Sequence, residues 1–314
     1  MSEKIWVLGD AVVDLIPDGE QHYLRCAGGA PANVSVGVAR LGGESGFIGK
    51  VGKDPLGEFM QQTLQQEKVD TTFMTLDPAQ RTSTVVVGLD QGERSFTFMV
   101  NPSADQFLHV SELPTFSQGQ WLHCCSIALI NDPSRTATFT AMKNIRQAQG
   151  YVSFDPNLRE SLWQSLDEMR EVVMQAVALA DVLKFSEEEL TFLTQTDSLE
   201  KAFEKITALY PQKLIIVTLG KEGALYHFNG AKEIVAGKAL QPVDTTGAGD
   251  AFVGGLLAGL SQNPDWQSNH ETLVKILRQA NACGALATTA KGAMSALPNH
   301  EQLHAFLSEK GECQ

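Results

Sequence analysis

The sequence predicts an α/β fold: a three-layer αβα domain with a largely parallel central sheet and a small β-sheet lid. Short apolar runs rich in β-branched residues recur along the 314 residues, and most are separated by stretches of helical periodicity. Such alternation favours parallel strands covered by the intervening helices. Two strand-like runs joined by a polar turn break the alternation and predict the lid.

The regular part of the pattern gives the order of the elements in the large sheet. Strands are expected at residues 5–8, 47–51, 121–126, 151–154, 182–185 and 214–219. Helices are expected at residues 33–41, 56–66, 135–147, 169–180 and 199–209. Together they describe one sheet with helices on both of its faces.

The lid is expected as an insertion at about residues 12–26 and 84–106 of a single domain that spans residues 1–314. Runs 84–89 and 95–100 read as strands, because the polar, glycine-containing segment between them is typical of a hairpin turn. One side of the second run is apolar, which suggests that this face of the lid covers something. Its apolar side chains are Phe96, Phe98 and Val100.

Composition and charge exclude several classes of protein. The chain carries 24 Lys and Arg against 37 Asp and Glu, a net charge of −13, and no basic block is visible, so nucleic acid is not expected as a partner. No run is long and apolar enough for a signal peptide or a membrane span, which favours a cytoplasmic protein without a membrane partner. The five cysteines lack Cys-x-x-Cys spacing, and Cys124 and Cys125 are expected as buried thiols.

The stretch VDTTGAGDAF, residues 243–252, combines a small-residue turn with a carboxylate at the start of an expected helix. Gly247, Ala248 and Gly249 would leave the first N–H groups of that helix bare, and bare N–H groups at a helix start bind anions. Asp250 would lie beside such an anion, where a carboxylate is unfavourable unless it has a task such as accepting a proton. From these residues alone, phosphate transfer and ordinary helix capping are about equally good explanations.

Four further stretches place polar groups or glycines at expected strand ends or helix starts. They are Gly28-Gly29 with Asn33, the run 154–159 (FDPNLR), the acidic run 186–189, and Thr218 with Gly220. Each alone has a plain structural explanation as a turn or a cap. In parallel sheets, however, the carboxyl ends of the strands face one ligand-binding crevice, so their accumulation favours a binding site. A Walker A motif and the protein-kinase motifs are absent from the sequence.

GGAPANVSVGVARLG followed by IGKVGKDPLG, together with DTTGAGDAF, resembles the two signatures of the ribokinase-like (PfkB) sugar kinase family. The resemblance extends from residue 5 to about residue 307. It implies a three-layer αβα domain with a β lid, ATP as phosphoryl donor, Mg²⁺, and often activation by K⁺. GDAVVDL, GERSFTF and KGAMSALP are most similar to bacterial members that phosphorylate D-fructose, and next to members that phosphorylate aminoimidazole riboside.

The resemblance also implies roles for single residues. Asp250 matches the base that deprotonates the sugar hydroxyl, and Arg159 matches a residue near the substrate or the transferred phosphate. The backbone amides of Gly247, Ala248 and Gly249 match the anion hole. The residues implied to bind the sugar are Asp10, Asp14, Gly28, Gly29, Asn33 and Phe98, together with Asp250. Those implied to bind the nucleotide are Ser186, Glu189, Thr218, Gly220, Gly249 and Asn281. Those implied in the monovalent-cation loop are Asp244, Thr246, Ala287, Ala290 and Gly292.

Two positions depart from the family pattern. Ser186 stands where the family has Asn, so the Asn contribution to Mg²⁺ or phosphate binding is missing, while Glu189 can still hold Mg²⁺ through water. Ala296 stands where some relatives place a hydroxyl on the cation, which removes one ligand.

Three hypotheses about function follow. The first is a kinase that converts D-fructose and ATP to fructose 6-phosphate and ADP, with a homodimer through the lid. The second keeps the fold and takes aminoimidazole riboside as substrate. The third is a non-catalytic sugar- or nucleotide-binding regulator, against which the intact Asp250 and Gly-Ala-Gly turn argue.

Overall fold

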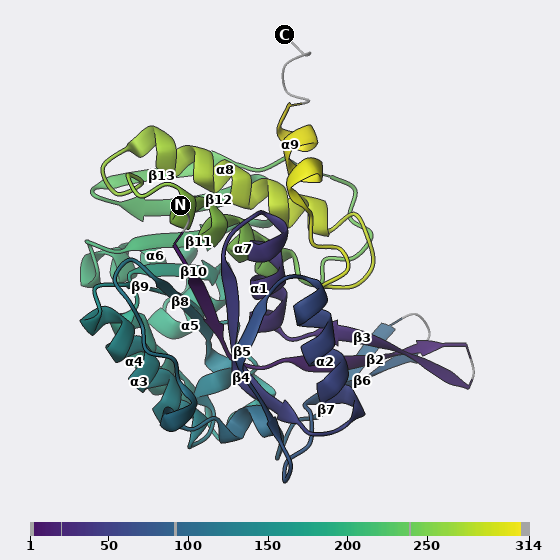
Figure 1. Cartoon of the computed structure of the whole chain (residues 1–314). Helices are drawn as coiled ribbons and strands as arrows, with labels where there is room; N and C mark the ends of the chain where they lie inside the picture. Colours follow the sequence, from purple (N-terminus) through teal and green to yellow (C-terminus); the bar gives the residue numbers. More distant parts are fainter. Residues whose placement is uncertain (1–2, 20, 91–92, 239, 309–314) are drawn as a thin grey trace.

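A nine-stranded sheet forms the centre of this computed structural model, which describes residues 3–19, 21–90, 93–238 and 240–308, with the backbone alone at 89–90 and 93–96. Its strands lie in the order β13-β12-β11-β10-β9-β8-β1-β4-β5 (Figure 1). In that order they span Ala231–Ala236, Gly223–Phe228, Leu214–Thr218, Val182–Ser186, Tyr151–Asp155, Trp121–Cys125, Ile5–Leu8, Ser45–Gly52 and Asp70–Asp77.

Most neighbouring strands of the sheet are parallel, which confirms the predicted sheet. In the register, Ile5 of β1 lies opposite Ser45 of β4 on one side and Trp121 of β8 on the other. Strands β12 and β13 pair antiparallel at one edge and were not predicted. They are joined at Asn229-Gly230, whose φ angles of 49° and 82° belong to a tight hairpin turn. That dipeptide was a usable signal for the hairpin.

Helices cover both faces of the sheet, because successive strand residues point to opposite sides (Figure 1). Trp6 and Leu8 pack on one side, and Ile5 and Val7 pack on the other. The first side carries α3 (Ser134–Gln147), α4 (Leu166–Leu179), α5 (Glu187–Thr194) and α6 (Leu199–Leu209). The second carries α1 (Ala30–Arg40), α2 (Pro55–Gln66), α7 (Ala248–Gln262) and α8 (His270–Ala287), with α9 (His300–Ser308) against α8.

The cysteines and the helix lengths can also be compared with the sequence predictions. Cys124 and Cys125 are buried free thiols, as predicted. Among the helices of the described residues, none has the length and apolar character needed to cross a membrane.

The lid is a four-stranded sheet that projects to one side of the large sheet (Figure 1). Its order is β3 (His22–Gly28), β2 (Val12–Asp18), β6 (Thr84–Asp90) and β7 (Glu93–Met99). The outer pairs are antiparallel and the central β2–β6 pair is parallel. Because β2 follows β1 after only a few residues, the lid stands directly over the carboxyl end of that central strand. The side chain of Phe96 lies outside the described residues, so its predicted orientation is untested.

Helices α1 and α7 approach each other closely at a pair of glycines. A Cβ atom added to Gly254 would lie 3.2 Å from the Cα atom of Gly37, which is tighter than ordinary side-chain contact. The lack of side chains at both positions lets the two helix backbones touch. This contact sets the relative position of the two helix starts, which carry Asn33 and Asp250.

We expect Gly254→Val to lower the free energy of unfolding by about 1–3 kcal/mol, because its side chain would meet the α1 backbone, which cannot move aside alone. Ala178→Val in α4 is the control for placing a β-branched side chain in a helix, since Ala178 is exposed and the added methyl groups would face solvent. Urea unfolding of the three proteins measures the difference. Equal stability of the Gly254 variant and the wild type would show that the glycine contact does not constrain the helices.

Candidate active site

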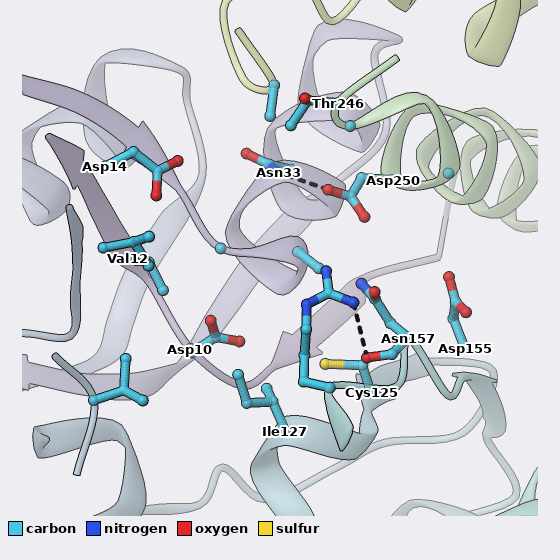
Figure 2. A pocket seen from close by; sticks show the side chains of 18 of the residues that line it. Asp10, Val12, Asp14, Asn33, Cys125, Ile127, Asp155, Asn157, Thr246 and Asp250 are labelled. Carbon is cyan, nitrogen blue, oxygen red and sulfur yellow. Dashed lines mark hydrogen bonds between the residues drawn. The ribbon is translucent and has the colours of Figure 1, made fainter. Parts of the chain in front are cut away.

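A cavity of about 520 Å³ lies between the lid and the carboxyl ends of the central strands. Val12 and Phe98 line it from the lid, while Cys125 and Asp155 line it from the ends of β8 and β9. Figure 2 shows Asp10, Asp14, Asn33 and Asp250 arranged around this one space. The structure thus brings together residues that are far apart in the sequence.

The start of α7 forms one wall of the cavity. Gly247 is its N-cap, in the left-handed region with φ of 79°, and a Cβ there would lie 2.9 Å from the Cα of Ala293. The amide of Ala248 donates to the carbonyl of Thr245 at 3.2 Å, so it is engaged within the turn. Within the described residues, no backbone partner is found for the amides of Gly247 and Gly249. These two N–H groups keep the character of an anion site.

Asp250 lies in the first turn of α7 and is partly buried. The side-chain amide of Asn33 donates to its Oδ2 at 2.8 Å (Figure 2). Burial raises the pKa of Asp250 from 3.8 to about 6, and the negative charge of Asp155 adds to this. The bond from Asn33 and the charges of Lys184 and Arg159 act in the opposite direction. A carboxylate with such a pKa is largely ionised at neutral pH yet basic enough to accept a proton.

Another carboxyl that lines the cavity, Asp10, is buried. Burial and the charge of Asp105 raise its pKa to about 7. Asp105, held by a bond of 2.6 Å from Ser103, was missed by the sequence analysis, although it follows the lid strands in the run NPSADQF. Burial likewise raises the pKa of Asp14 to about 6. The site therefore holds several acids whose charged forms are incompletely solvated.

Three polar atoms of residues lining the cavity are buried and lack a hydrogen-bond partner within the described chain. They are Oδ1 of Asp10, Oδ1 of Asn33 and Oδ1 of Asp155. Buried polar atoms are rarely left unpaired in native proteins, so these acceptors point to a ligand that brings donors. The hydroxyl groups of a sugar are such donors.

Two predicted sugar contacts are glycines with different roles. Gly29 lines the cavity with φ of 93°, and a Cβ there would lie 2.8 Å from the carbonyl oxygen of Asp10. Gly28 does not line the cavity; a Cβ there would lie 2.6 Å from Oδ2 of Asp14. Gly28 therefore makes room for a carboxylate that does line it.

A second cavity, of about 320 Å³, lies on the other side of the α7 start. Thr218, Gly220 and Asn281, all predicted nucleotide contacts, line it together with Gly249. The side chain of Asn281 donates to the carbonyl of Val235 at 2.8 Å, which fixes its orientation. Gly249 lines both cavities, so the two spaces meet at the N-terminus of α7.

The predicted pair Ser186 and Glu189 has a structural role at the start of α5. The two residues form a capping box: Glu189 Oε2 accepts from the Ser186 amide at 2.8 Å, and Ser186 Oγ accepts from the Glu189 amide at 3.2 Å. Glu189 Oε1 also accepts from the amide of Leu158 at 2.9 Å. Neither residue is among those that line the two cavities. Of the predicted site, Arg159 does line the larger one, and it donates to the carbonyl of Leu158 at 2.9 Å.

The predicted cation loop is folded around Asp244. Its Oδ1 accepts from Thr246 Oγ1 at 2.7 Å and its Oδ2 from the amide of Gly292 at 3.2 Å. The amides of Val243 and Asp244 both donate to the carbonyl of Thr288. The structure thus brings segment 243–246 against the chain that follows α8, which contains Ala290; Ala287 is the last residue of α8. No cluster of three or more acidic, His or Cys side chains fit to hold a metal occurs in the described parts of the chain.

The chain is similar over nearly its whole length to known sugar and nucleoside kinases. The sequence profile described as pfkB family carbohydrate kinase matches residues 2–300. The fructokinase of Vibrio alginolyticus is 56% identical over 98% of this chain and 99% of its own length. The aminoimidazole riboside kinase of Salmonella typhimurium is 45% identical over 99% of this chain and 97% of its own length.

Solved structures give the same relationship in three dimensions. The crystal structure of fructokinase from Vibrio cholerae O395 with fructose, ADP and a calcium ion has a TM-score of 0.92 and 59% identity, covering 98% of this chain and 99% of that one. A double mutant of that fructokinase, with fructose, ADP and a potassium ion, also has a TM-score of 0.92 and 59% identity, covering 98% of each chain.

We expect the free energy of unfolding of Asp10→Asn, compared with that of the wild type, to be higher at pH 8 than at pH 5. The pKa of Asp10 is raised on folding from 3.8 to about 7, so the folded state holds this proton more tightly than the unfolded state does. The resulting stabilisation is fully present below pH 3.8 and is lost progressively as the pH rises from there through 7. When the pH is raised from about 5 to 8, the free energy of unfolding of the variant should therefore increase relative to that of the wild type by up to about 3 kcal/mol.

Urea unfolding at the two pH values measures this gain. The matched control is Asp167→Asn, since the Asp167 side chain is 95% exposed and should show no comparable gain. A stability difference for Asp10→Asn that is equal at both pH values would contradict a buried, incompletely compensated carboxyl at this position.

Proposed function

The chain belongs to the pfkB family of carbohydrate kinases, and we propose that it is an ATP-dependent fructokinase that converts D-fructose and ATP to fructose 6-phosphate and ADP. The support from relatives is their identity to this chain, 53–56% for four bacterial fructokinases. The observation in the structure that carries the proposal is the position of Asp250. This partly buried base lies where two cavities meet, beside amides fit to bind an anion.

In the proposed reaction the sugar binds in the larger cavity and its hydroxyls donate to the unpaired oxygens of Asp10, Asn33 and Asp155. Asp250 accepts the proton of the attacking hydroxyl while that oxygen bonds to the γ-phosphorus of ATP and the bond to ADP breaks. Asn33 holds one oxygen of Asp250 and leaves the other for the proton. The amides of Gly247 and Gly249 stabilise the negative charge on the transferred group.

The nucleotide is proposed to occupy the cavity of about 320 Å³, with Thr218, Gly220 and Asn281 as contacts. Lys221 and Lys238 also line that cavity and bring positive charge to an otherwise acidic protein. Magnesium, when bound with ATP, would neutralise phosphate charge. Glu189, whose two oxygens each accept a backbone N–H group, would act on it through one of the waters that Mg²⁺ usually keeps.

The monovalent cation is proposed to be K⁺, held by carbonyl oxygens of the loop around Asp244 and of the chain near Ala287, Ala290 and Gly292. The position supports this proposal, because the loop leads directly into Gly247 and would set the direction of its amide. Ala296 offers no hydroxyl, so the loop has one ligand fewer than in some relatives.

The lid is proposed to belong to a single kinase domain and to close over the sugar with Phe98, excluding water from the phosphates. Tyr23, Leu24 and Met99, each more than half exposed, lie on the two edge strands of the lid. Apolar side chains at open sheet edges favour pairing, and we propose a homodimer through the lid. Because ATP is the donor, the cytoplasm is the proposed location, with neither nucleic acid nor membrane as a partner.

Aminoimidazole riboside is the second candidate substrate. It is favoured by one feature of the cavity: Phe98 is an aromatic side chain on the lid that could stack on an imidazole as well as cover a sugar. The riboside kinase is less similar, at 45% against 53–56%. The regulator hypothesis is not retained, because the chain keeps Asp250 beside the anion-binding start of α7.

The proposal is tested by turnover of D-fructose, D-ribose, D-glucose and aminoimidazole riboside with ATP. We expect kcat/KM for D-fructose to exceed the others by at least about tenfold, or about 1.4 kcal/mol. Asp250→Asn is the control for mechanism, and its kcat should fall by about 10²–10⁴-fold because the base is lost. Faster turnover of the riboside than of fructose at equal sub-saturating concentration would overturn the substrate and leave the kinase chemistry intact.

A further inference from the structure

Lys184 is a buried lysine that neither the sequence analysis nor the mechanism above uses. It lies in β10 and only 9% of it is exposed. Its neighbours Leu183 and Phe185 pack on the side of the sheet that carries α3–α6, so strand alternation turns Lys184 to the side of α7. Asp155, at the end of the neighbouring strand β9, faces the same way.

The ammonium group reaches the place where the two cavities meet. Its Nζ donates to Oδ2 of Asp155 at 3.0 Å. A Cβ atom built on Gly249 would lie 3.4 Å from the same Nζ, so the ammonium lies close beside the anion-binding start of α7. Lys184 lines the larger cavity, and Gly249 lines both.

The charges around Lys184 keep it protonated. Burial alone would lower its pKa, but Asp155, Glu189 and Asp250 raise it above its ordinary value. His123 lies nearby on β8, and its Nδ1 forms a hydrogen bond with the hydroxyl of Ser153. Burial and the charge of Lys184 lower the pKa of His123 to about 3, so it adds no positive charge at neutral pH. The remaining charged groups that act on Asp250 from within the cavity are Arg159 and Asp10.

A purely structural ion pair would account for only part of this arrangement. An ammonium has three N–H donors, and the one hydrogen bond found for it within the described residues goes to Asp155. The other oxygen of Asp155 is buried without a partner. Burying a charge pair with unused donors and acceptors gives little net stability unless a ligand completes it.

We propose that Lys184 is a catalytic residue, which donates a hydrogen bond to an oxygen of the transferred phosphoryl group, and that Asp155 is a positioning residue, which holds the ammonium there. The inference rests on the phosphoryl transfer proposed above but not on the identity of the sugar. No proton leaves Lys184 in the step: its charge balances that of the phosphoryl oxygens while Asp250 takes the proton of the sugar hydroxyl. A positive charge fixed in a dry site is an effective means of stabilising such charge.

Lys184→Met tests this role, with Lys213→Met as the matched control. Lys213 is also a buried lysine, but it precedes β11 at the opposite end of the sheet and donates to the carbonyls of Val177, Ala178 and Ala180. Both variants lose a buried ammonium, so both should lose stability. Only the Lys184 variant should change the chemistry.

We expect Lys184→Met to lower kcat by about 10²–10³-fold with a fructose KM within about threefold of wild type, and to leave the affinity for ADP unchanged. The acidic limb of its kcat/KM profile should move to higher pH, because Asp250 loses a nearby cation that lowers its pKa. Asp155→Asn should lower kcat less, because the ammonium remains. Lys213→Met should keep the wild-type kinetic constants and pH profile.

A folded Lys184→Met enzyme with kcat within about threefold of wild type, or with an unmoved acidic limb, would overturn the inference. If that variant does not fold, Lys184→Gln takes its place and is judged by the same two measurements. Failure of the proposed function is recognised separately, since wild type and Lys213→Met would then both fail to phosphorylate fructose.

Discussion

The hydrogen bond from Asn33 to Asp250 is the contact on which the site depends, because it joins two helices that come from opposite ends of the chain. Asn33 belongs to the first turn of α1 and Asp250 to the first turn of α7. Their 2.8 Å contact exists because the two helices touch at Gly37 and Gly254 with no side chain between them. The same helix start gives the anion-binding amides their direction, so the packing of two glycines fixes both the base and the anion site.

Electrostatic balance is the second constraint. Asp10 is buried and Asp105 and Asp250 are partly buried, and desolvation raises the pKa of each to between about 6 and 7. Without compensation, these acids would strongly repel the polyanionic triphosphate of ATP. Lys184 and Arg159 supply positive charge on the side of the strand ends, while the α7 amides supply it on the other. The acidic net charge of the protein is therefore countered only locally.

The sequence predicted the parts of the site that are continuous in the chain. The turn before α7, Asp250 and the Gly28-Gly29 stretch each follow from a short motif whose backbone requirements are visible in its residue types. Lys184 and Asp105 could not be found in this way. The contact of Lys184 with Asp155 depends on the register of two neighbouring strands, and the effect of Asp105 on Asp10 depends on how the segment after β7 folds back toward the end of β1. In the fold, the alternation predicted the parallel strands, whereas the β12–β13 hairpin was missed although Asn229-Gly230 signalled it.

Ser186 is both a predicted nucleotide contact and the N-cap of α5. By resemblance it belongs to the nucleotide site, and in the structure its hydroxyl caps α5. An asparagine can cap a helix as well, so the capping geometry itself is no departure from the family. What differs is the side chain left over for a ligand, since serine has no amide group to donate.

The ionisation of Asp250 is the central claim, and it can be measured directly by carbon-13 NMR of side-chain carboxyls, with the Asp250→Asn protein used to assign its signal. The structure predicts a carboxyl that titrates with a pKa of about 6 in the wild type, and with a higher pKa in Asn33→Ala, where the hydrogen bond that favours the charged form is gone. A signal that titrates near the ordinary value of 3.8, and that Asn33→Ala does not move, would contradict the account.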